Sequence, residues 1–368
     1  MNSDNKFKII FIIFVFTTVL SVSFFAIWID PYVKEVNFEG VKSISVIEYD
    51  YENNNWNELD FINAQFDEKG NMIFEDRFDA ENNLQYSYEY IYDDNDYMIE
   101  VNGKRNREGE VFYYNYIYDY DERGNQIRGT GYDTEGNVIS IYTAEYDEND
   151  NLIKTEEFTE GYTGSMYEAN YDANNNLISE SKYIAYEYKG EQKYQFEYRN
   201  EFVYDERNNV IEETTYGDRE EFSFNHIYKY DESDNLIKAF DVDINGNVLS
   251  TYEAWYDADG NMIEFKMFDK SGKLTAHNKA EYCENKMIKE TDCLGSNETV
   301  ISSAIYNENG ALIEQIYLNS SLGSGFLEKY KYIYDEKGNQ IEEIYYVYFE
   351  DIESWKPISK QRNVIEYK

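Results

Sequence analysis

One short motif recurs along most of this 368-residue chain and restricts what the chain can fold into. An aromatic residue is followed by aspartate, two variable residues, a small or polar residue and asparagine, as in Tyr120-Asp121-Glu122-Arg123-Gly124-Asn125. Aspartate bonds to the backbone two residues further on, and glycine or asparagine adopts the positive φ of hairpin turns. Each copy therefore predicts a chain reversal. Copies begin at Phe66, Tyr120, Tyr132, Tyr146, Tyr171, Tyr204, Tyr230, Tyr256, Phe268 and Tyr334, and weaker copies at Phe78, Tyr92, Val242, Tyr282 and Tyr306.

The spacing between copies alternates. Phe66, Phe78 and Tyr92 are 12 and then 14 residues apart, and the same alternation runs from Tyr120 to Tyr146. The repeating unit is therefore about 26 residues long and contains two turns. Subtracting the turns leaves strands of about eight residues, an ordinary length. Successive turns then lie on opposite edges, and the pattern predicts an antiparallel meander of roughly twenty strands.

Tyrosines occupy alternate positions within the expected strands. Tyr86, Tyr88, Tyr90 and Tyr92 share one face, while the positions between them are more polar. A period of two with one aromatic face is typical of a half-buried antiparallel sheet. A sheet of this many strands curls or splits into layers. We therefore expect an all-β fold, either a coiled or spiral sheet with its tyrosine face inward or an elongated two-layer stack.

Two parts of the repeat region depart from the regular spacing. Between Tyr171 and Tyr230 the copies are further apart, which predicts longer hairpins at 188–191 and 216–218. The final stretch, 354–368, leaves the motif and holds one of the chain's two prolines. We expect it to cap the last open edge, because repeat arrays must protect such edges.

An uncharged, mostly apolar run at 9–29 has about the length of a membrane-spanning helix. Lys6 and Lys8 precede it and Asp30 follows, which places the N-terminus in the cytoplasm and the C-terminal region outside the cell. Cleavage at Ser21-Val22-Ser23 would instead give a secreted protein. The expected organisation is a cytoplasmic N-terminus at 1–8, a transmembrane signal-anchor at 9–29, a linker at 30–45, the repeat array at 46–345 and a cap at 346–368.

The composition excludes some classes of partner. Aspartate and glutamate number 74 against 33 lysines and arginines, a net charge of −41. Nucleic acid is not an expected partner, because phosphate recognition needs a basic stripe. The charge keeps an extended sheet soluble, and it could also attract a cationic protein or divalent ions. The 40 tyrosines argue against a disordered acidic chain, which would be poor in aromatic residues.

The repeated Tyr-Asp-x-x-Gly-Asn with a following leucine or isoleucine resembles the YD repeats of bacterial RHS proteins. It is also similar to the repeats of MORN-variant proteins described as antitoxin-like. The resemblance covers roughly residues 46–345. It implies a shell of β-hairpins, often on cell surfaces, with carbohydrate or protein binding as the associated activity.

The motifs that could carry chemistry favour structural roles. Residues 241–246 match the first half of an EF-hand loop, but its twelfth position is Tyr252 instead of glutamate, so we expect a turn there. His226 alternates with tyrosines and is expected to pack on the aromatic face. The other histidine, His277, lies 51 residues away, and no histidine or cysteine cluster has metal-ligand spacing. No metal or cofactor is expected.

Cys283 and Cys293 are about one strand apart, roughly 20 Å or more. A disulfide needs Cα atoms within about 7 Å, so we expect two unpaired thiols unless a local hairpin brings them together. Trp255 is the candidate ligand contact, because its neighbours Ala254 and Tyr256 point to the other face and leave its ring outside the tyrosine register.

These observations predict a membrane-anchored cell-surface repeat protein that acts as a non-catalytic binding or adhesion scaffold for glycan or protein. The alternative is an antitoxin- or immunity-like protein, or a structural envelope protein. An enzyme is not expected, because nothing resembles a nucleophile motif. Carboxylates are so abundant in this chain that their presence alone carries no information about catalysis.

Overall fold

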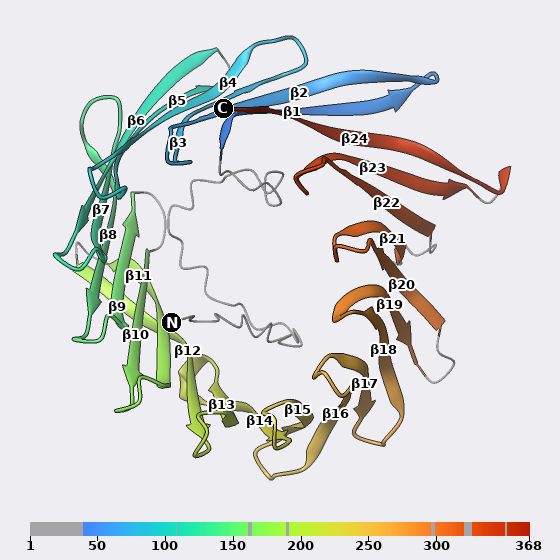
Figure 1. The fold of residues 1–368 in the computed structure, drawn as a ribbon. Coiled ribbons are helices and arrows are strands. Elements are labelled where there is room, and N and C mark those ends of the chain that lie inside the picture. Colours follow the sequence, from blue (N-terminus) through green and yellow to red (C-terminus); the bar gives the residue numbers. More distant parts are fainter. Residues whose placement is uncertain are drawn as a thin grey trace, which may run out of the picture. The chain divides into compact units, whose positions relative to one another are not determined.

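The computed structural model describes residues 40–107, 109–160, 164–188, 191–295, 299–319, 326–349 and 352–368. These residues belong to the unit Asn37–Lys368 and form 24 strands and one short 3-10 turn, η2 (Asp218–Glu220) (Figure 1). The strands are β1 (Val41–Glu52), β2 (Asn55–Phe66), β3 (Met72–Phe78), β4 (Leu84–Tyr92), β5 (Met98–Arg107), β6 (Glu110–Tyr120), β7 (Gln126–Tyr132), β8 (Val138–Tyr146), β9 (Leu152–Thr159), β10 (Gly164–Tyr171), β11 (Leu177–Tyr188), β12 (Glu191–Tyr204), β13 (Val210–Tyr216), β14 (Phe222–Tyr230), β15 (Leu236–Val242), β16 (Val248–Tyr256), β17 (Met262–Asp269), β18 (Leu274–Cys283), β19 (Lys286–Leu294), β20 (Thr299–Tyr306), β21 (Leu312–Asn319), β22 (Phe326–Tyr334), β23 (Gln340–Phe349) and β24 (Ser354–Tyr367).

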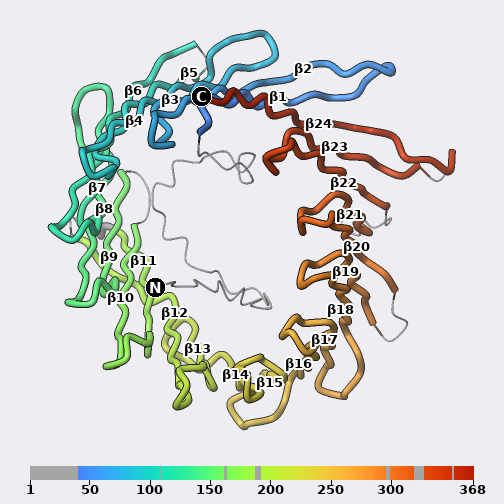
Figure 2. The backbone as a smooth tube through the Cα atoms, viewed as in Figure 1, coloured from blue at the N-terminus to red at the C-terminus, as the bar shows by residue number. Residues whose placement is uncertain are grey.

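The strands form one closed antiparallel sheet. Each strand pairs with the next along the chain, so the protein is a repeat of β-hairpins. The last strand, β24, pairs with β23 on one side and with β1 on the other, for example Ile44 with Ile365. Figure 2 follows the backbone through successive strands from blue to red, and the red end returns to the blue strand β1.

The predicted coiled or spiral sheet is wrong, and the N-terminal transmembrane helix predicted with it lies outside the described residues. The sheet is closed, because the pairing of β1 with β24 joins its two ends. Hydrophobic periodicity reports which residues share a face of one strand. It does not report that the first and last strands of a long meander meet, since that contact spans more than 300 residues.

The predicted single-pass membrane anchor also needs correction. Within the residues that the structure describes, no helix is both long and apolar enough to cross a membrane. The transmembrane segment expected at 9–29 and the cleavage site at Ser21-Val22-Ser23 lie outside the described residues. The single-pass localisation at the cell membrane therefore has no support from any described element.

The core lies on the face that carries the motif tyrosines, which we name the tyrosine face. Tyr90 and Tyr118 are 4% and 6% exposed, and most other residues of this face are half-buried. Positions between the tyrosines are more open: Ile117 and Ile333 are 41% and 45% exposed. Burial of one face of each strand matches the alternation of two residues along the sequence.

Successive connections lie on two opposite edges of the sheet. On the motif edge, each even-numbered strand leads into the next odd-numbered one, almost always through an aspartate turn. The other edge also has aspartate turns, which begin at Asp79, Asp133, Asp243 and Asp269. Four long hairpins extend past their neighbours on this edge: β1–β2, β5–β6, β11–β12 and β23–β24. We name this second edge the arm edge.

The long hairpin predicted at 188–191 is present, since β11 and β12 have 12 and 14 residues. At 216–218 the structure instead has strands of ordinary length, β13 and β14, joined through η2. Of the predicted cap, Ser354–Tyr367 form β24, which covers the edges of both β1 and β23 instead of capping a single open edge.

Candidate functional site

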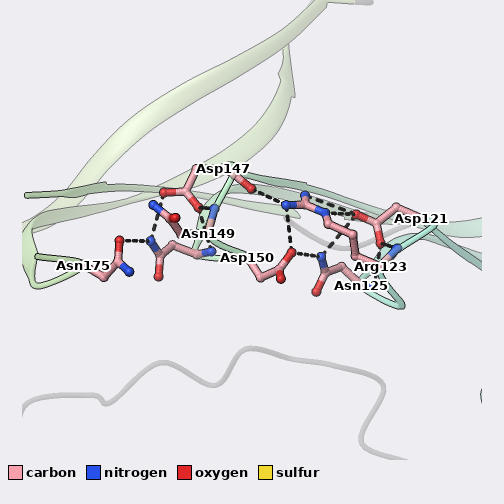
Figure 3. Close-up of polar contacts among 8 residues, drawn as sticks. Asp121, Arg123, Asn125, Asp147, Asn149, Asp150 and Asn175 are labelled. Carbon is pink, nitrogen blue, oxygen red and sulfur yellow. Dashed lines mark hydrogen bonds and ion pairs between the residues drawn. The ribbon is translucent and has the colours of Figure 1, made fainter. Parts of the chain in front are cut away.

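The acidic turns of the motif edge are closed hydrogen-bonded structures. In the turn after β6, the backbone N–H groups of Arg123 and Asn125 donate to Asp121 Oδ1 at 2.9 and 2.8 Å. The Asn125 amide also donates to Asp150 Oδ1 of the next turn at 2.8 Å, and Arg123 lies 2.8 Å from the same carboxylate (Figure 3). The next link joins the Asn151 amide to Asn175 Oδ1 at 3.3 Å.

The electrostatics of these turns follow from those bonds. The side-chain amide of Asn151 and then backbone N–H groups hold the pKa of Asp147 below its ordinary value, against an opposing effect of burial. The EF-hand-like segment contains the same turn, in which Asp243 N–H donates to the Asn247 carbonyl at 3.0 Å. In the described part of the chain, no group of three or more acidic, histidine or cysteine side chains could hold a metal ion.

A hollow of about 360 Å³ lies where the β11–β12 hairpin meets β8 and β9. We name it the β9 hollow, and it is lined by Ile141, Thr143, Glu156, Glu157, Phe158, Ala185, Tyr186 and Gln192. Phe158 and Tyr186 are 38% and 40% exposed. In the pairing of β8 with β9, Ile141 lies opposite Phe158 and Thr143 lies opposite Glu156. These four side chains therefore share the face opposite the tyrosine face.

Small residues at the start of β10 and in β11 make room for the hollow. Gly164 pairs with Ala185, which is only 1% exposed. A Cβ atom on Gly164 would overlap the carbonyl oxygen of Glu157, so the backbones of β9 and β10 approach closely there. Ala185 in turn pairs with Tyr194 of β12, whose ring is 39% exposed. A floor of small side chains is thus bordered by rings.

The polar groups of the β9 hollow are oriented by their neighbours. Glu156 lies 2.8 Å from the ammonium of Lys154 and also bonds the hydroxyl of Tyr194. Burial, followed by the charge of Glu156, raises the pKa of Tyr194, so this hydroxyl keeps its proton. Glu157 is on the tyrosine face, opposite Tyr142 in register, and burial raises the pKa of its half-buried carboxyl.

The structure places Trp255 away from this hollow. Its ring is 40% exposed on the face opposite the tyrosine face, where the register of β16 predicted it. Lys266 from β17 lies 5.0 Å from the ring centroid and makes a cation–π contact. One face of the ring is therefore partly occupied.

The histidines and cysteines belong to separate environments. His226 packs against Phe224 at 4.8 Å and lies 2.5 Å from Asp241, so it is an aromatic-face residue as predicted. Buried His277 lies 2.6 Å from Glu264. Cys283 and Cys293 form no disulfide, which agrees with the spacing argument.

Sequence reasoning missed the β9 hollow, because its side chains come from four strands and belong to no motif copy. The available signal was the 33-residue gap between Tyr171 and Tyr204, which marks the long hairpin beside it. Phe158, Gly164 and Ala185 belong to three different strands, and that they lie side by side becomes evident only once the register of their strands is known.

Comparisons with known proteins reveal only remote likenesses. No family model matches the chain, and no curated protein matches it. Among solved structures, a TcdB2-TccC3-Cdc42 crystal structure is similar with 11% identity and a TM-score of 0.27, over 83% of this chain and 25% of that one. A porin-like protein from Bacteroides uniformis is similar with 11% identity and a TM-score of 0.30, over 62% of this chain and 97% of that one. The chain thus spans about a quarter of the TcdB2-TccC3 chain.

Proposed function

We propose that this protein is a non-catalytic scaffold that binds a glycan in the β9 hollow. The observation that carries the proposal is the combination of two exposed rings, Phe158 and Tyr194, with the oriented carboxylate of Glu156 on one face of the sheet, around one concave site. The volume of about 360 Å³ falls in the range of small-ligand pockets.

The apolar C–H face of a sugar and its hydroxyl groups both match the groups that line the hollow. The C–H face of a pyranose ring packs on aromatic side chains, which supply large rigid contact areas. Sugar hydroxyls donate to a carboxylate such as Glu156 and exchange hydrogen bonds with Gln192 and Thr143. A flat polar ring therefore uses every class of group that lines the hollow.

The arrangement of carboxylates favours binding over hydrolysis. Glycoside hydrolysis needs two carboxyl groups that flank one bond. Glu156 and Glu157 are successive residues of β9, so their side chains leave opposite faces of the sheet. Glu156 is also engaged by Lys154 and Tyr194, which suits a fixed acceptor better than a proton donor.

A glycan array probed with the full chain tests the proposal. We expect binding to at least one glycan, reduced about tenfold or more by Phe158→Ala or by Glu156→Gln. Trp255→Ala is the matched control, because it removes an equally exposed ring outside the hollow and should leave binding unchanged. Binding that is lost only in Trp255→Ala would contradict the site, and release of reducing sugar from the bound glycan would contradict the non-catalytic assignment.

A further inference from the structure

The β5–β6 hairpin carries a group of cations in a strongly acidic protein. Lys104, Arg105 and Arg107 fall within four consecutive residues, while the whole chain has a net charge of −41. Arg105 and Arg107 are exposed and Lys104 is half-buried. These three side chains therefore form a local positive site on a negative background.

The hairpin projects beyond both of its neighbours. The pairing of β4 with β5 reaches Arg105, and the pairing of β6 with β7 covers only residues 115–120. Residues 106–107 and 110–114 thus form a two-stranded arm on the arm edge (Figure 1), which we name the β5–β6 arm together with residues 104–105. Thr134 fixes its base, because its hydroxyl bonds the backbone N and O of Tyr113 at 3.1 and 3.2 Å.

The three cations have no acidic partner among the residues that the structure describes. Elsewhere in the described sheet, cations such as Arg77 and Arg123 pair with carboxylates at 2.8 Å. In the described part of the arm the one acid is Glu110, opposite Arg107 in register; Glu108 lies outside the described residues. An exposed charge without an internal partner remains available to an external one.

Apolar side chains accompany the cations on both faces of the arm. Val111, Phe112 and Tyr113 are 46%, 38% and 52% exposed. Phe112 pairs with Arg105 on one face, and Tyr113 pairs with Lys104 on the other. Arginine and aromatic residues are enriched in protein–protein interfaces, where they form the energetic centre.

We propose that the β5–β6 arm is a docking element for an acidic polypeptide of another protein. Charge complementarity sets the sign of the partner. The presence of a ring and a cation on each face indicates a partner that surrounds the arm, which a folded or folding polypeptide can do. A linear anionic polysaccharide would contact one face. This surface is separate from the β9 hollow, so the inference does not rest on glycan binding.

The remaining charge of the protein gives this interaction a characteristic salt dependence. At low ionic strength the Debye length is about 30 Å, and the acidic sheet repels an acidic partner from a distance. Near physiological salt the length is about 8 Å, so the long-range repulsion is screened while contacts at the arm persist. Binding therefore peaks at intermediate ionic strength, whereas a uniformly basic surface would bind more weakly with every addition of salt.

The test measures binding of the full chain to a fluorescein-labelled random copolymer of glutamate and tyrosine. The fluorescence anisotropy of the copolymer is recorded between about 0.01 and 1 M salt. The arm variant carries Lys104→Gln, Arg105→Gln and Arg107→Gln. The control variant carries Lys270→Gln, Lys273→Gln and Lys279→Gln, three exposed lysines whose removal changes the net charge equally. Circular dichroism verifies that both variants are folded.

We expect copolymer binding with a maximum at intermediate salt, weakened about tenfold or more in the arm variant and unchanged in the control. Val111→Ser with Tyr113→Ser should weaken it at least about threefold. Equal loss in both charge variants, or no binding at any salt concentration, overturns the proposal. Stronger binding of heparin through the same three cations reassigns the arm to anionic glycans. Self-association that depends on the arm, without copolymer binding, reassigns it to a second copy of this chain.

Discussion

At the scale of single residues, the hydroxyl of the motif tyrosine explains why tyrosine is preferred before the turn aspartate. Tyr230, at the end of β14, donates to the carbonyl of Val210, the first residue of β13, at 2.9 Å. The same bond recurs at 2.7 to 3.2 Å from Tyr92, Tyr120, Tyr146, Tyr171, Tyr204, Tyr256 and Tyr334. Each hydroxyl thus satisfies a backbone acceptor at the motif edge.

We expect Tyr230→Phe to lower the free energy of unfolding by about 1 kcal/mol, because the ring stays packed while the carbonyl of Val210 loses its donor. Urea unfolding followed by circular dichroism measures this difference. Tyr113→Phe is the control, since its ring is 52% exposed, and it should change stability by less than about 0.5 kcal/mol. Equal effects of the two substitutions would contradict the assigned role of the hydroxyl.

This role was not predictable from the sequence. The alternation of tyrosines indicated a buried face, and the turn chemistry indicated reversals, because both depend on residues close together in the chain. Phe66 and Phe268 occupy the same motif position without a hydroxyl, so the pattern specified an aromatic ring and no more. The acceptor lies about 20 residues away and becomes evident only with the register of two strands.

At the scale of the strands, glycines allow tyrosine rings to lie flat on the sheet. Gly103 of β5 pairs with Tyr88 of β4, and an added Cβ atom would come within 2.8 Å of the Tyr88 ring. Gly129 of β7 pairs with Tyr118 of β6, where the added atom would lie 3.4 Å from the ring. Glycine inside a strand is unfavourable unless something approaches closely, and here a ring does so.

The substitution Gly103→Ala should therefore destabilise the protein by about 1 to 3 kcal/mol, because the Tyr88 ring must move from its packed position. Gly129→Ala offers a matched comparison under a second tyrosine, with an ordinary contact distance, and its cost should be clearly smaller. Thermal unfolding of the two variants compares them directly. A larger effect at Gly129 would exclude ring overlap as the cause.

The strand count shows the limit of motif-based prediction. The structure has 24 strands where the repeat predicted roughly twenty, because several hairpins of the arm edge use other turns. β1 and β2 are joined through Asn53 and Asn54, both with positive φ, and this pair lies outside any motif copy. The β5–β6 arm lacks the motif too, so both its reversal and its cations remained unnoticed in the sequence pattern.

At the scale of the whole molecule, the buried tyrosines set an upper pH limit for stability. Burial and then the charge of Asp205 raise the pKa of Tyr230 to about 12, and burial raises that of Tyr92 to about 12. The pKa of Tyr90 is raised further by burial and the charge of Glu75. A raised folded-state pKa means that stability is fully present below the ordinary value of about 10 and is lost as pH rises through the folded value.

We therefore expect a constant urea midpoint up to about pH 10 and a steep fall between about pH 10 and 12. Tyrosinate absorbance should increase together with the loss of circular dichroism, because the buried phenols ionise only on unfolding. Chemically denatured protein is the control and should titrate near pH 10. Complete tyrosine ionisation in a still-folded protein would contradict the burial of the tyrosine face.

The closure of the sheet leads to the last prediction. Deleting residues 354–368 removes β24 and exposes the backbone edges of β1 and β23 together. Exposed strand edges pair with other chains, so the truncated protein should associate in a concentration-dependent manner, as measured by sedimentation velocity. The deletion removes four cations and one acid, which makes the chain more negative and opposes association. Association of the truncated chain would therefore show that strand pairing overcomes the added charge repulsion. Trp355→Ala is the control, because it leaves the backbone of β24 in place, and it should remain monodisperse under the same conditions if the full chain does. A truncated chain that stays monodisperse and folded would show that β24 is not needed to protect these edges.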